Sequence, residues 1–286
     1  MKIGVVFPQT EIGPDVGPVR DYTQAAEDLG YTHLLAYDHV LGASLENRPD
    51  FKGPYNSKTQ FREVFVLFGY MAAITSRLEL VTGVIILPQR QTALVAKQAA
   101  EIDLLSEGRF RLGVGIGWND VEYTGLNENF RNRGKRMEEQ IDVMRKLFTE
   151  PVVDFKGRYH EIPEAGLNPL PVQRPIPIWI GGTAPAALER AGRISDGWFP
   201  QVQPGERLTE MLGHVAAGAQ AAGRDPASIP MEGRLTLSNT EPDAWKALTD
   251  AWRESGASHL SVNTMGKGMS PDQHIDMLRR YREAIS

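Results

Sequence analysis

The chain has 286 residues, of which 41% are hydrophobic, enough for one large α/β domain or two small ones. A formal net charge of −5 with no basic stripe argues against nucleic acid as a partner. The absence of cysteine excludes disulfides, thiol chemistry and thiolate metal sites.

The start of the chain and its longest apolar run bear on two possible features, a signal peptide and a membrane-spanning segment. Met1-Lys2 leads directly into an apolar strand, so no signal peptide is recognised. The longest apolar stretch, at 64–74, is too short to span a bilayer. We therefore expect a cytoplasmic protein without a membrane partner.

The first part of the chain alternates strands and helices. An apolar strand is expected at 2–7, and a helix follows, because apolar residues recur every three or four positions from 19 to 29. A second strand at 32–37 precedes a polar loop at 41–60 and a helix at 61–75. Loops of this length inside a compact domain are usually functional or mobile.

The stretch from Leu78 to Pro88 is the most informative strand. It is an almost continuous apolar run rich in β-branched residues, typical of a strand buried on both faces of a parallel sheet. Gly83 interrupts the run, and a glycine inside a strand indicates a bulge or a close approach of a ligand. Two interpretations stay open at this point: a kinked core strand, or backbone that approaches a ligand.

The remainder continues the alternation. Further strands are expected at 110–114, 176–180, 196–200, 231–237 and 259–263. Further helices are expected at 95–102, 131–149, 185–193 and 207–222, and after the capping segments that begin at Thr240 and Ser270. A proline-rich excursion at 151–175 contains a small hairpin around Gly157.

Eight strands, each followed by a helix and without a break in composition, predict a (β/α)8 TIM barrel that spans 1–286 as a single domain. Its insertions are expected at the C-terminal face of the strands. The alternative is a doubly wound open sheet, which would place phosphate-binding glycines after the first strand. The segment Phe7-Pro-Gln-Thr10 has none, which favours the barrel.

In a barrel the site lies where the C-terminal ends of the strands meet. These ends are at 8–9, 38–39, 83–87, 115–118, 181–183, 200–201, 238–239 and 263–264. They hold one histidine, no pair of acids suited to glycoside hydrolysis and no cluster with metal-ligand spacing, so no metal site is expected. Nothing there supports a Ser–His nucleophilic pair. A site with so few reactive groups indicates that a cofactor supplies the chemistry.

Two mouth segments carry specific signals. Gly181-Gly182-Thr183 precedes a helix, and uncovered N–H groups at a helix N-terminus bind phosphate; the alternative is an ordinary turn. Asp38-His39 is the best acid–base candidate, because an adjacent carboxylate can orient and charge a histidine; the alternative is a loop anchor. The other five histidines are interpreted as structural or exposed: His33, His160, His214, His259 and His274.

The glycine-rich turn from Gly113 to Trp118 is weak evidence for phosphate binding. We interpret it as packing near a flat ligand, with Trp118 as a stacking wall. Glu122 and Tyr123 are expected to line the same rim; alternatively, they anchor this loop to Arg131 or Arg133.

Taken together, these segments resemble the bacterial luciferase-like superfamily, and within it the oxidoreductases that use the deazaflavin coenzyme F420. The matching segments are Asp38-His39, Thr82-Gly83-Val84, 96–100, 105–109, Gly113-Val-Gly-Ile-Gly-Trp118, Glu122-Tyr123, Ile180-Gly-Gly-Thr183, 191–193 and 196–198. They run from about residue 3 to residue 200; the final third matches only in its strand–helix pattern.

The resemblance implies a (β/α)8 barrel, usually dimeric, that binds a flavin-like ring at its mouth. It also implies a cis peptide at Gly83–Val84 behind the ring, His39 at the reacting edge, and a phosphate on Gly181–Thr183. The residues expected to bind cofactor are Asp38, His39, Gly83, Val84, Gly115, Trp118, Gly181, Gly182, Thr183 and Gln201. The expected catalytic residues are His39 and Glu122.

The sequence departs from the sugar-phosphate dehydrogenase branch of this superfamily at two positions. Ala43 stands where that branch has a tryptophan, and Trp118 stands where it has a glutamate acid. We expect Glu122 to replace the missing acid. The substrate pocket is expected to be built from 41–60, 118–130 and 151–175.

Three functions follow as hypotheses. The first is an F420-dependent oxidoreductase that transfers a hydride between the cofactor and a small organic substrate. The second is an FMN-dependent monooxygenase supplied with reduced cofactor by a separate reductase, and the third is a barrel that binds flavin or deazaflavin without turnover. A homodimer is expected only from the resemblance.

Overall fold

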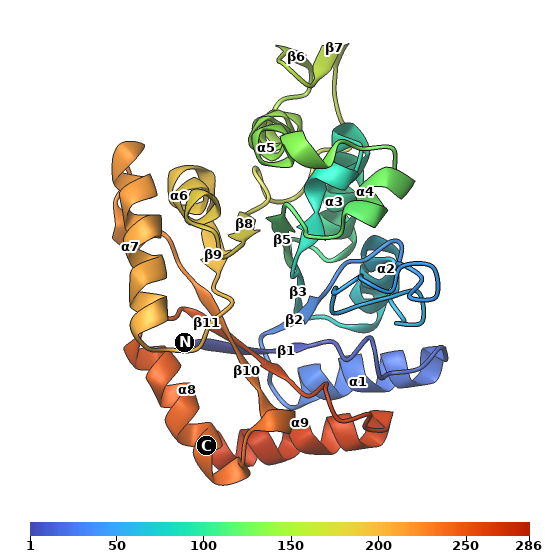
Figure 1. Cartoon of the computed structure of the whole chain (residues 1–286), viewed down its shortest axis with the longest axis vertical. Helices are drawn as coiled ribbons and strands as arrows, with labels where there is room; N and C mark the ends of the chain where they lie inside the picture. Colours follow the sequence, from blue (N-terminus) through green and yellow to red (C-terminus); the bar gives the residue numbers. More distant parts are fainter.

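The computed structural model describes all 286 residues, and its strands form a nearly closed parallel barrel surrounded by helices (Figure 1). In spatial order the barrel strands are β10 (Glu232–Thr236), β11 (His259–Asn263), β1 (Lys2–Val6), β2 (His33–Ala36), β3 (Glu79–Thr82), β5 (Phe110–Gly115), β8 (Ile178–Gly181) and β9 (Gly197–Phe199). A bridge between Trp198 and Met231 brings β9 to the start of β10 and nearly closes the ring.

A helix follows every barrel strand, as the sequence predicts. The helices are α1 (Val16–Asp28), α2 (Val64–Ile74), α3 (Thr92–Leu105), α4 (Asp120–Gly125), α5 (Arg133–Thr149), α6 (Pro185–Ile194), α7 (Glu206–Ala221), α8 (Trp245–Glu254) and α9 (Pro271–Ile285). Short 3₁₀ helices occur at Leu87–Gln89, Phe130–Asn132, Pro226–Ser228, Leu237–Asn239 and Pro242–Ala244. The predicted (β/α)8 TIM barrel is therefore confirmed, and none of the helices is both long and apolar enough to cross a bilayer.

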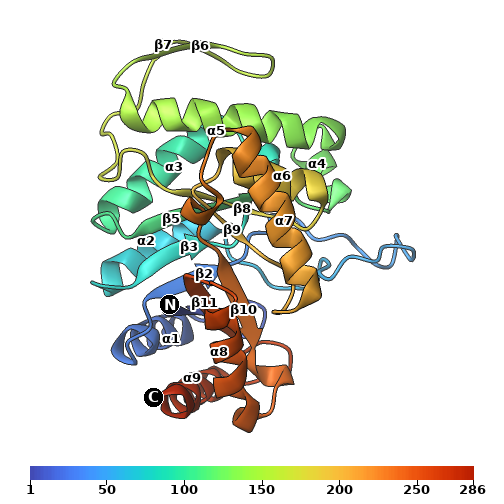
Figure 2. The ribbon, with the colours of Figure 1, turned by 90° about the vertical axis from the view of Figure 1, so that its left-hand side faces the viewer.

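The predicted hairpin is also present, as β6 (Val153–Lys156) paired antiparallel with β7 (Glu161–Ala165). Figure 2 shows it outside the barrel, beside α5. Two helices differ from the prediction: α2 begins only at Val64, because the Glu63 carboxylate caps it by accepting the N–H of Val66, and α4 lies where a loop was expected.

The strand at 78–88 is broken, as its glycine predicts. β3 ends at Thr82, the peptide bond between Gly83 and Val84 is cis, and a short strand β4 (Ile85–Ile86) resumes the pairing with β5. The cis bond expected from the resemblance is therefore present in the structure.

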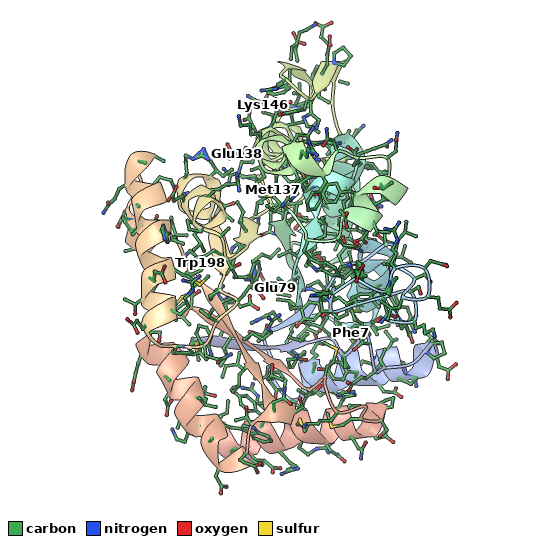
Figure 3. All side chains as sticks on the ribbon, in the orientation of Figure 1. Phe7, Glu79, Met137, Glu138, Lys146 and Trp198 are labelled. Atoms are coloured by element: carbon green, nitrogen blue, oxygen red, sulfur yellow. The ribbon has the colours of Figure 1, made fainter.

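The barrel interior has layers, because alternate residues of a strand point to the same side. On β2, His33 lies in a lower ionic layer and Leu35 in an apolar layer above it, whereas Tyr37, just beyond the strand, lines the mouth. The larger apolar core lies between the strands and the helices. Figure 3 shows side chains filling both spaces, with Glu79 near the centre of the barrel.

Glu232 is the hub of the ionic layer, and only 2% of its surface is exposed. Its carboxylate accepts hydrogen bonds from Arg111 Nη1 (2.7 Å), His33 Nε2 (3.1 Å) and Ser261 Oγ (2.5 Å). Burial favours the protonated form, but the interactions with His33 and Arg111 outweigh it and hold the pKa of Glu232 well below its usual range. The sequence did not predict this layer.

We expect Glu232→Gln to lower the free energy of unfolding at pH 7 by about 3 kcal/mol, because the buried Arg111 would lose its closer acidic partner and keep only the more exposed Glu79. The folded-state pKa of Glu232 is depressed, so its contribution is present above the unfolded carboxyl pKa and is lost as the pH falls. The difference between wild type and variant should therefore shrink in acid. Urea titrations at several pH values test this, with the exposed Glu241→Gln as control; equal unfolding curves at pH 7 would contradict it.

Candidate active site

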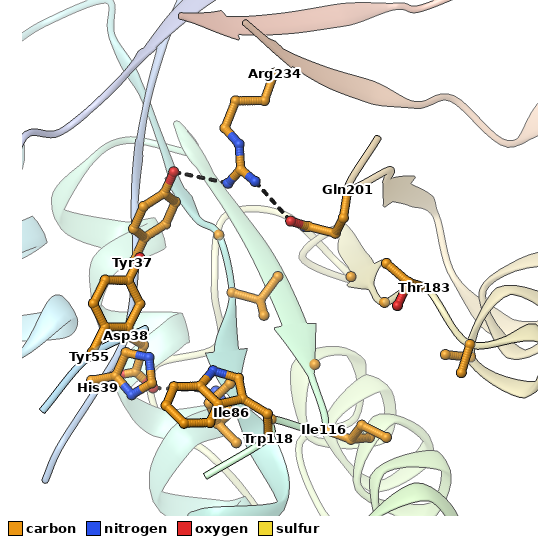
Figure 4. Close-up of a pocket in the computed structure, with 18 residues that line it drawn as sticks. Tyr37, Asp38, His39, Tyr55, Ile86, Ile116, Trp118, Thr183, Gln201 and Arg234 are labelled. Carbon is orange, nitrogen blue, oxygen red and sulfur yellow. Dashed lines mark hydrogen bonds between the residues drawn. The ribbon is translucent and has the colours of Figure 1, made fainter. Parts of the chain in front are cut away.

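A cavity of about 450 Å³ lies at the C-terminal mouth of the barrel (Figure 4). All residues predicted to bind a cofactor line it: Asp38, His39, Gly83, Val84, Gly115, Trp118, Gly181, Gly182, Thr183 and Gln201. The lining also includes residues that the sequence did not single out as ligands: Tyr37, Tyr55, Ile86, Ile116, Gly117, Ala184, Ala187 and Arg234.

The floor of the cavity consists of glycine backbone and the side chain of Val84, which packs over two glycines on neighbouring strands. A Cβ atom at Gly115 would lie 2.7 Å from Val84 Cγ2, and one at Gly181 would lie 3.0 Å from Val84 Cγ1. A Cβ atom at Gly83 would collide with the side chain of Leu35. At Gly113, a Cβ atom would meet the carbonyl oxygen of Thr82, which confirms a packing role for the glycine-rich turn.

His39 is fixed by a buried carboxylate from another part of the chain. Its Nδ1 lies 3.2 Å from Glu122 Oε2, and Glu122 Oε1 accepts the backbone N–H groups of Val40 (2.5 Å) and Leu41 (3.2 Å). Burial opposes ionisation of Glu122, but the hydrogen bonds from His39 and these backbone groups outweigh it and hold its pKa below the usual range. Glu122 itself is fully buried and lies behind His39 rather than in the cavity lining.

The expectation that Asp38 orients His39 is wrong. The Asp38 carboxylate instead accepts a hydrogen bond from Arg90 Nη2 (2.7 Å) and lies 3.3 Å from the N–H of Ile86. Asp38 thus ties the end of β2 to the segment after β3, and Glu122 is the carboxylate partner of His39.

The two aromatic residues of the 118–123 segment have different roles. Trp118 is 40% exposed and lies beside His39, with ring centroids 5.6 Å apart, so it flanks the cavity as expected. Tyr123 does not line the rim: it is fully buried, and its hydroxyl donates to the carbonyl oxygen of Ile116 (2.7 Å). Its ring packs on Phe130, and neither Tyr123 nor Glu122 makes a hydrogen bond or ion pair with Arg131 or Arg133, the anchors of the alternative interpretation.

The remaining histidines lie outside the cavity and make structural contacts, as predicted. His33 contacts Glu232, His160 contacts Glu139 (2.8 Å), His214 lies near Glu189 (3.4 Å), His259 contacts Ser258 (2.8 Å) and His274 contacts Thr264 (2.7 Å).

The turn before α6 presents free hydrogen-bond donors to the cavity. Gly182, Thr183 and Ala184 line the cavity, and their backbone N–H groups make no hydrogen bond within the chain. The helix itself begins at Pro185, one residue after its N-cap Ala184. Unpaired N–H groups next to a helix N-terminus form an anion site.

Arg234 is the most informative residue that the sequence analysis missed. Its Nη1 donates to the Tyr37 hydroxyl (2.9 Å) and its Nη2 donates to Gln201 Oε1 (2.8 Å), which ties the middle of β10 to the segments that follow β2 and β9 (Figure 4). The sequence does contain a signal for a polar role. Two charged residues, Glu232 and Arg234, lie two positions apart inside the predicted strand 231–237.

A second cavity of about 310 Å³ lies on the other side of His39 and Tyr55. Its remaining walls are Val40, Leu41, Gly42, Asn56, Ser57, Thr59, Phe61 and Asn119, from the loops expected to form a substrate pocket. The excursion 151–175 lines neither cavity. Glu139 on α5 holds it instead, accepting the N–H groups of Arg158 and Tyr159 at 2.7 Å each.

We expect Glu122→Gln to loosen the chain at Val40 and Leu41, because a neutral amide accepts hydrogen bonds less strongly than a carboxylate. The free energy of unfolding should fall by about 1.5–3 kcal/mol, and amide hydrogen exchange at these two residues should speed up. The depressed pKa means that wild type keeps this contribution at neutral pH and loses it as the pH falls below the usual carboxyl range. Exposed Glu46→Gln is the control, and unchanged exchange in Glu122→Gln would contradict the assignment.

The whole chain is similar to proteins that have been described before. An uncharacterised protein of Mycobacterium tuberculosis is 35% identical over 274 residues, 92% of each chain. The F420-dependent glucose-6-phosphate dehydrogenase of Segniliparus rotundus is 30% identical over 266 residues, which cover 90% of this chain and 76% of the relative.

Two solved structures share the fold. A monooxygenase from Streptomyces bottropensis has a TM-score of 0.82 at 20% identity, covering 100% of this chain and 98% of the other. An F420-dependent secondary alcohol dehydrogenase has a TM-score of 0.80 at 19% identity, covering 100% and 99%. The sequence model of the luciferase-like monooxygenase family matches residues 1–285. The resemblance found in the sequence is thus confirmed, and the chain belongs to the luciferase-like monooxygenase family.

Proposed function

We propose that the protein is an F420-dependent oxidoreductase that transfers a hydride between the deazaflavin and a small organic substrate. The observation that carries the proposal is a floor of glycine backbone and the Val84 side chain next to the unpaired N–H groups of 182–184, in one cavity with His39. A flat ring needs an even apolar surface on which to pack, and its phosphate needs hydrogen-bond donors. The relatives named as F420-dependent dehydrogenases support the choice of cofactor.

The residues present fit such a cofactor. Gly182, Thr183 and Ala184 would hold the phosphate, and the face formed by Gly83, Val84 and Gly115 would support the ring. When bound, the deazaflavin accepts or donates the hydride. The protein contributes position, exclusion of water and movement of a proton.

His39 is the residue we propose to carry that proton. Its Nδ1 faces Glu122, so its Nε2 is left to exchange a proton with the substrate oxygen. Glu122 acts through His39: it fixes the ring of the histidine, which makes it a positioning residue and not a second acid in contact with substrate.

The family description also keeps the FMN-dependent monooxygenase in view, because it names monooxygenases. FMN offers a similar ring and a phosphate, so it would use the same floor and the same turn at 182–184. That function would require a reductase partner to supply reduced FMN, and a homodimer is expected under either proposal.

Titration of wild type and His39→Ala with F420 and with FMN, followed by fluorescence quenching, tests the proposal. We expect both proteins to bind F420 at micromolar concentrations and neither to bind FMN in that range. Turnover of F420 with a panel of alcohols, aldehydes and ketones should fall by about 10²–10⁴-fold in His39→Ala, because proton transfer is lost while the floor and the phosphate donors remain.

His214→Gln, at a half-exposed histidine outside the cavity, is the matched control and should behave like wild type. Tight FMN binding without F420 binding, with oxygen consumption when reduced FMN is supplied, would establish the monooxygenase instead. Cofactor binding with no effect of His39→Ala on turnover would remove His39 from the mechanism.

A further inference from the structure

Arg234 carries a positive charge that no carboxylate offsets. The other two arginines of the barrel interior and mouth have acidic partners: Arg111 pairs with Glu232 and Arg90 pairs with Asp38, each at 2.7 Å. Arg234 donates only to neutral acceptors, the Tyr37 hydroxyl and the Gln201 amide oxygen. A half-buried guanidinium without an acid partner is available to bind an anionic group of a ligand.

The nearby acids cannot take this role. Glu232, two residues earlier on β10, is already engaged by Arg111, His33 and Ser261. Asp38 is engaged by Arg90. The cavity lining therefore has one positive charge without an acidic partner, at Arg234, which has donors to spare, because a guanidinium has five N–H groups and two of its nitrogens are used by neutral partners.

The turn at 182–184 is a second place in the same cavity where an anion can bind, and the proposed function assigns it to the cofactor. The free N–H groups of Gly182, Thr183 and Ala184 suit the cofactor phosphate. Figure 4 shows Gln201 between Thr183 and Arg234, so the guanidinium is a separate feature on the cavity wall. Two anion sites in one cavity indicate two anionic groups.

We propose that Arg234 is a specificity-determining residue that binds a carboxylate or phosphate group of the substrate. Tyr37 and Gln201 hold the planar guanidinium in one orientation, which favours a planar or tetrahedral anion that accepts two parallel hydrogen bonds. This inference rests on the proposed function for its assignment to the substrate, because that function explains the other anion site.

The experiment measures binding of sodium acetate and of inorganic phosphate by calorimetry, at constant ionic strength, with and without saturating F420. Wild type, Arg234→Gln, Arg234→Lys and a control, Arg253→Gln, are compared. Arg253 lies on α8, is exposed, and loses the same charge when it is replaced. Thermal unfolding of each variant checks the fold.

We expect wild type and Arg253→Gln to bind at least one of these anions when F420 is saturating. Arg234→Gln should weaken that binding by about tenfold or more, Arg234→Lys should recover part of it, and F420 affinity should stay unchanged. Equal anion binding in Arg234→Gln, or none in wild type, would overturn the proposal.

Two other results would also overturn it. A loss of F420 affinity in Arg234→Gln, with anion binding unchanged, would make the cofactor the source of the anion. If a lowered melting temperature is the sole effect of Arg234→Gln, the role of Arg234 is to hold neighbouring strands together. If F420 does not bind but anion binding still depends on Arg234, the anion site stands and the proposed cofactor falls.

Discussion

The contact between Val84 and two glycines on neighbouring strands is the constraint on which the mouth of this barrel depends. After the break in the third strand, Val84 lies beside Gly115 and Gly181; a side chain at Gly115 would collide with it, and one at Gly181 would press closely against it. Val84 therefore covers the ends of two neighbouring strands that carry glycine at this level. This gives the floor a shape that suits a flat ring, and it leaves the adjoining turn at 182–184 free to present its N–H groups.

Above this floor, buried ion pairs fix the groups that face the cavity. Glu122 holds His39 and the two residues that follow it, whereas Arg90 holds Asp38. Below it, the ionic layer around Glu232 is self-sufficient in charge. Arg234 differs from Arg90 and Arg111, which both have acidic partners within the protein. Its guanidinium contacts only neutral acceptors, and we propose that a ligand supplies the anionic partner.

Much of the fold could be predicted from the sequence, because it is encoded locally. Apolar runs followed by helical stripes give the strand–helix repeat, and the capping box at Ser270 marks α9 to the residue. The glycines at 83, 115 and 181–182 could be placed at the mouth, since the strand order of a barrel brings all strand ends together.

What could not be predicted depends on residues far apart in the chain. Glu122 and His39 are 83 positions apart in the chain, and neither segment indicates that they are partners. The sequence favours the adjacent Asp38, which in the structure pairs with Arg90 instead. The ionic layer joins residues on β2, β5, β10 and β11 in the same way. The pairing of Arg234 with Tyr37 spans 197 positions and follows from barrel closure alone.

The most direct test of this account is a crystal structure of the protein soaked or co-crystallised with F420. The account predicts that the deazaflavin ring lies against the backbone of Gly83, Val84 and Gly115, that the phosphate accepts hydrogen bonds from the N–H groups of 182–184, and that His39 faces the reacting edge. A ring bound elsewhere, or a phosphate that avoids the turn before α6, would contradict it.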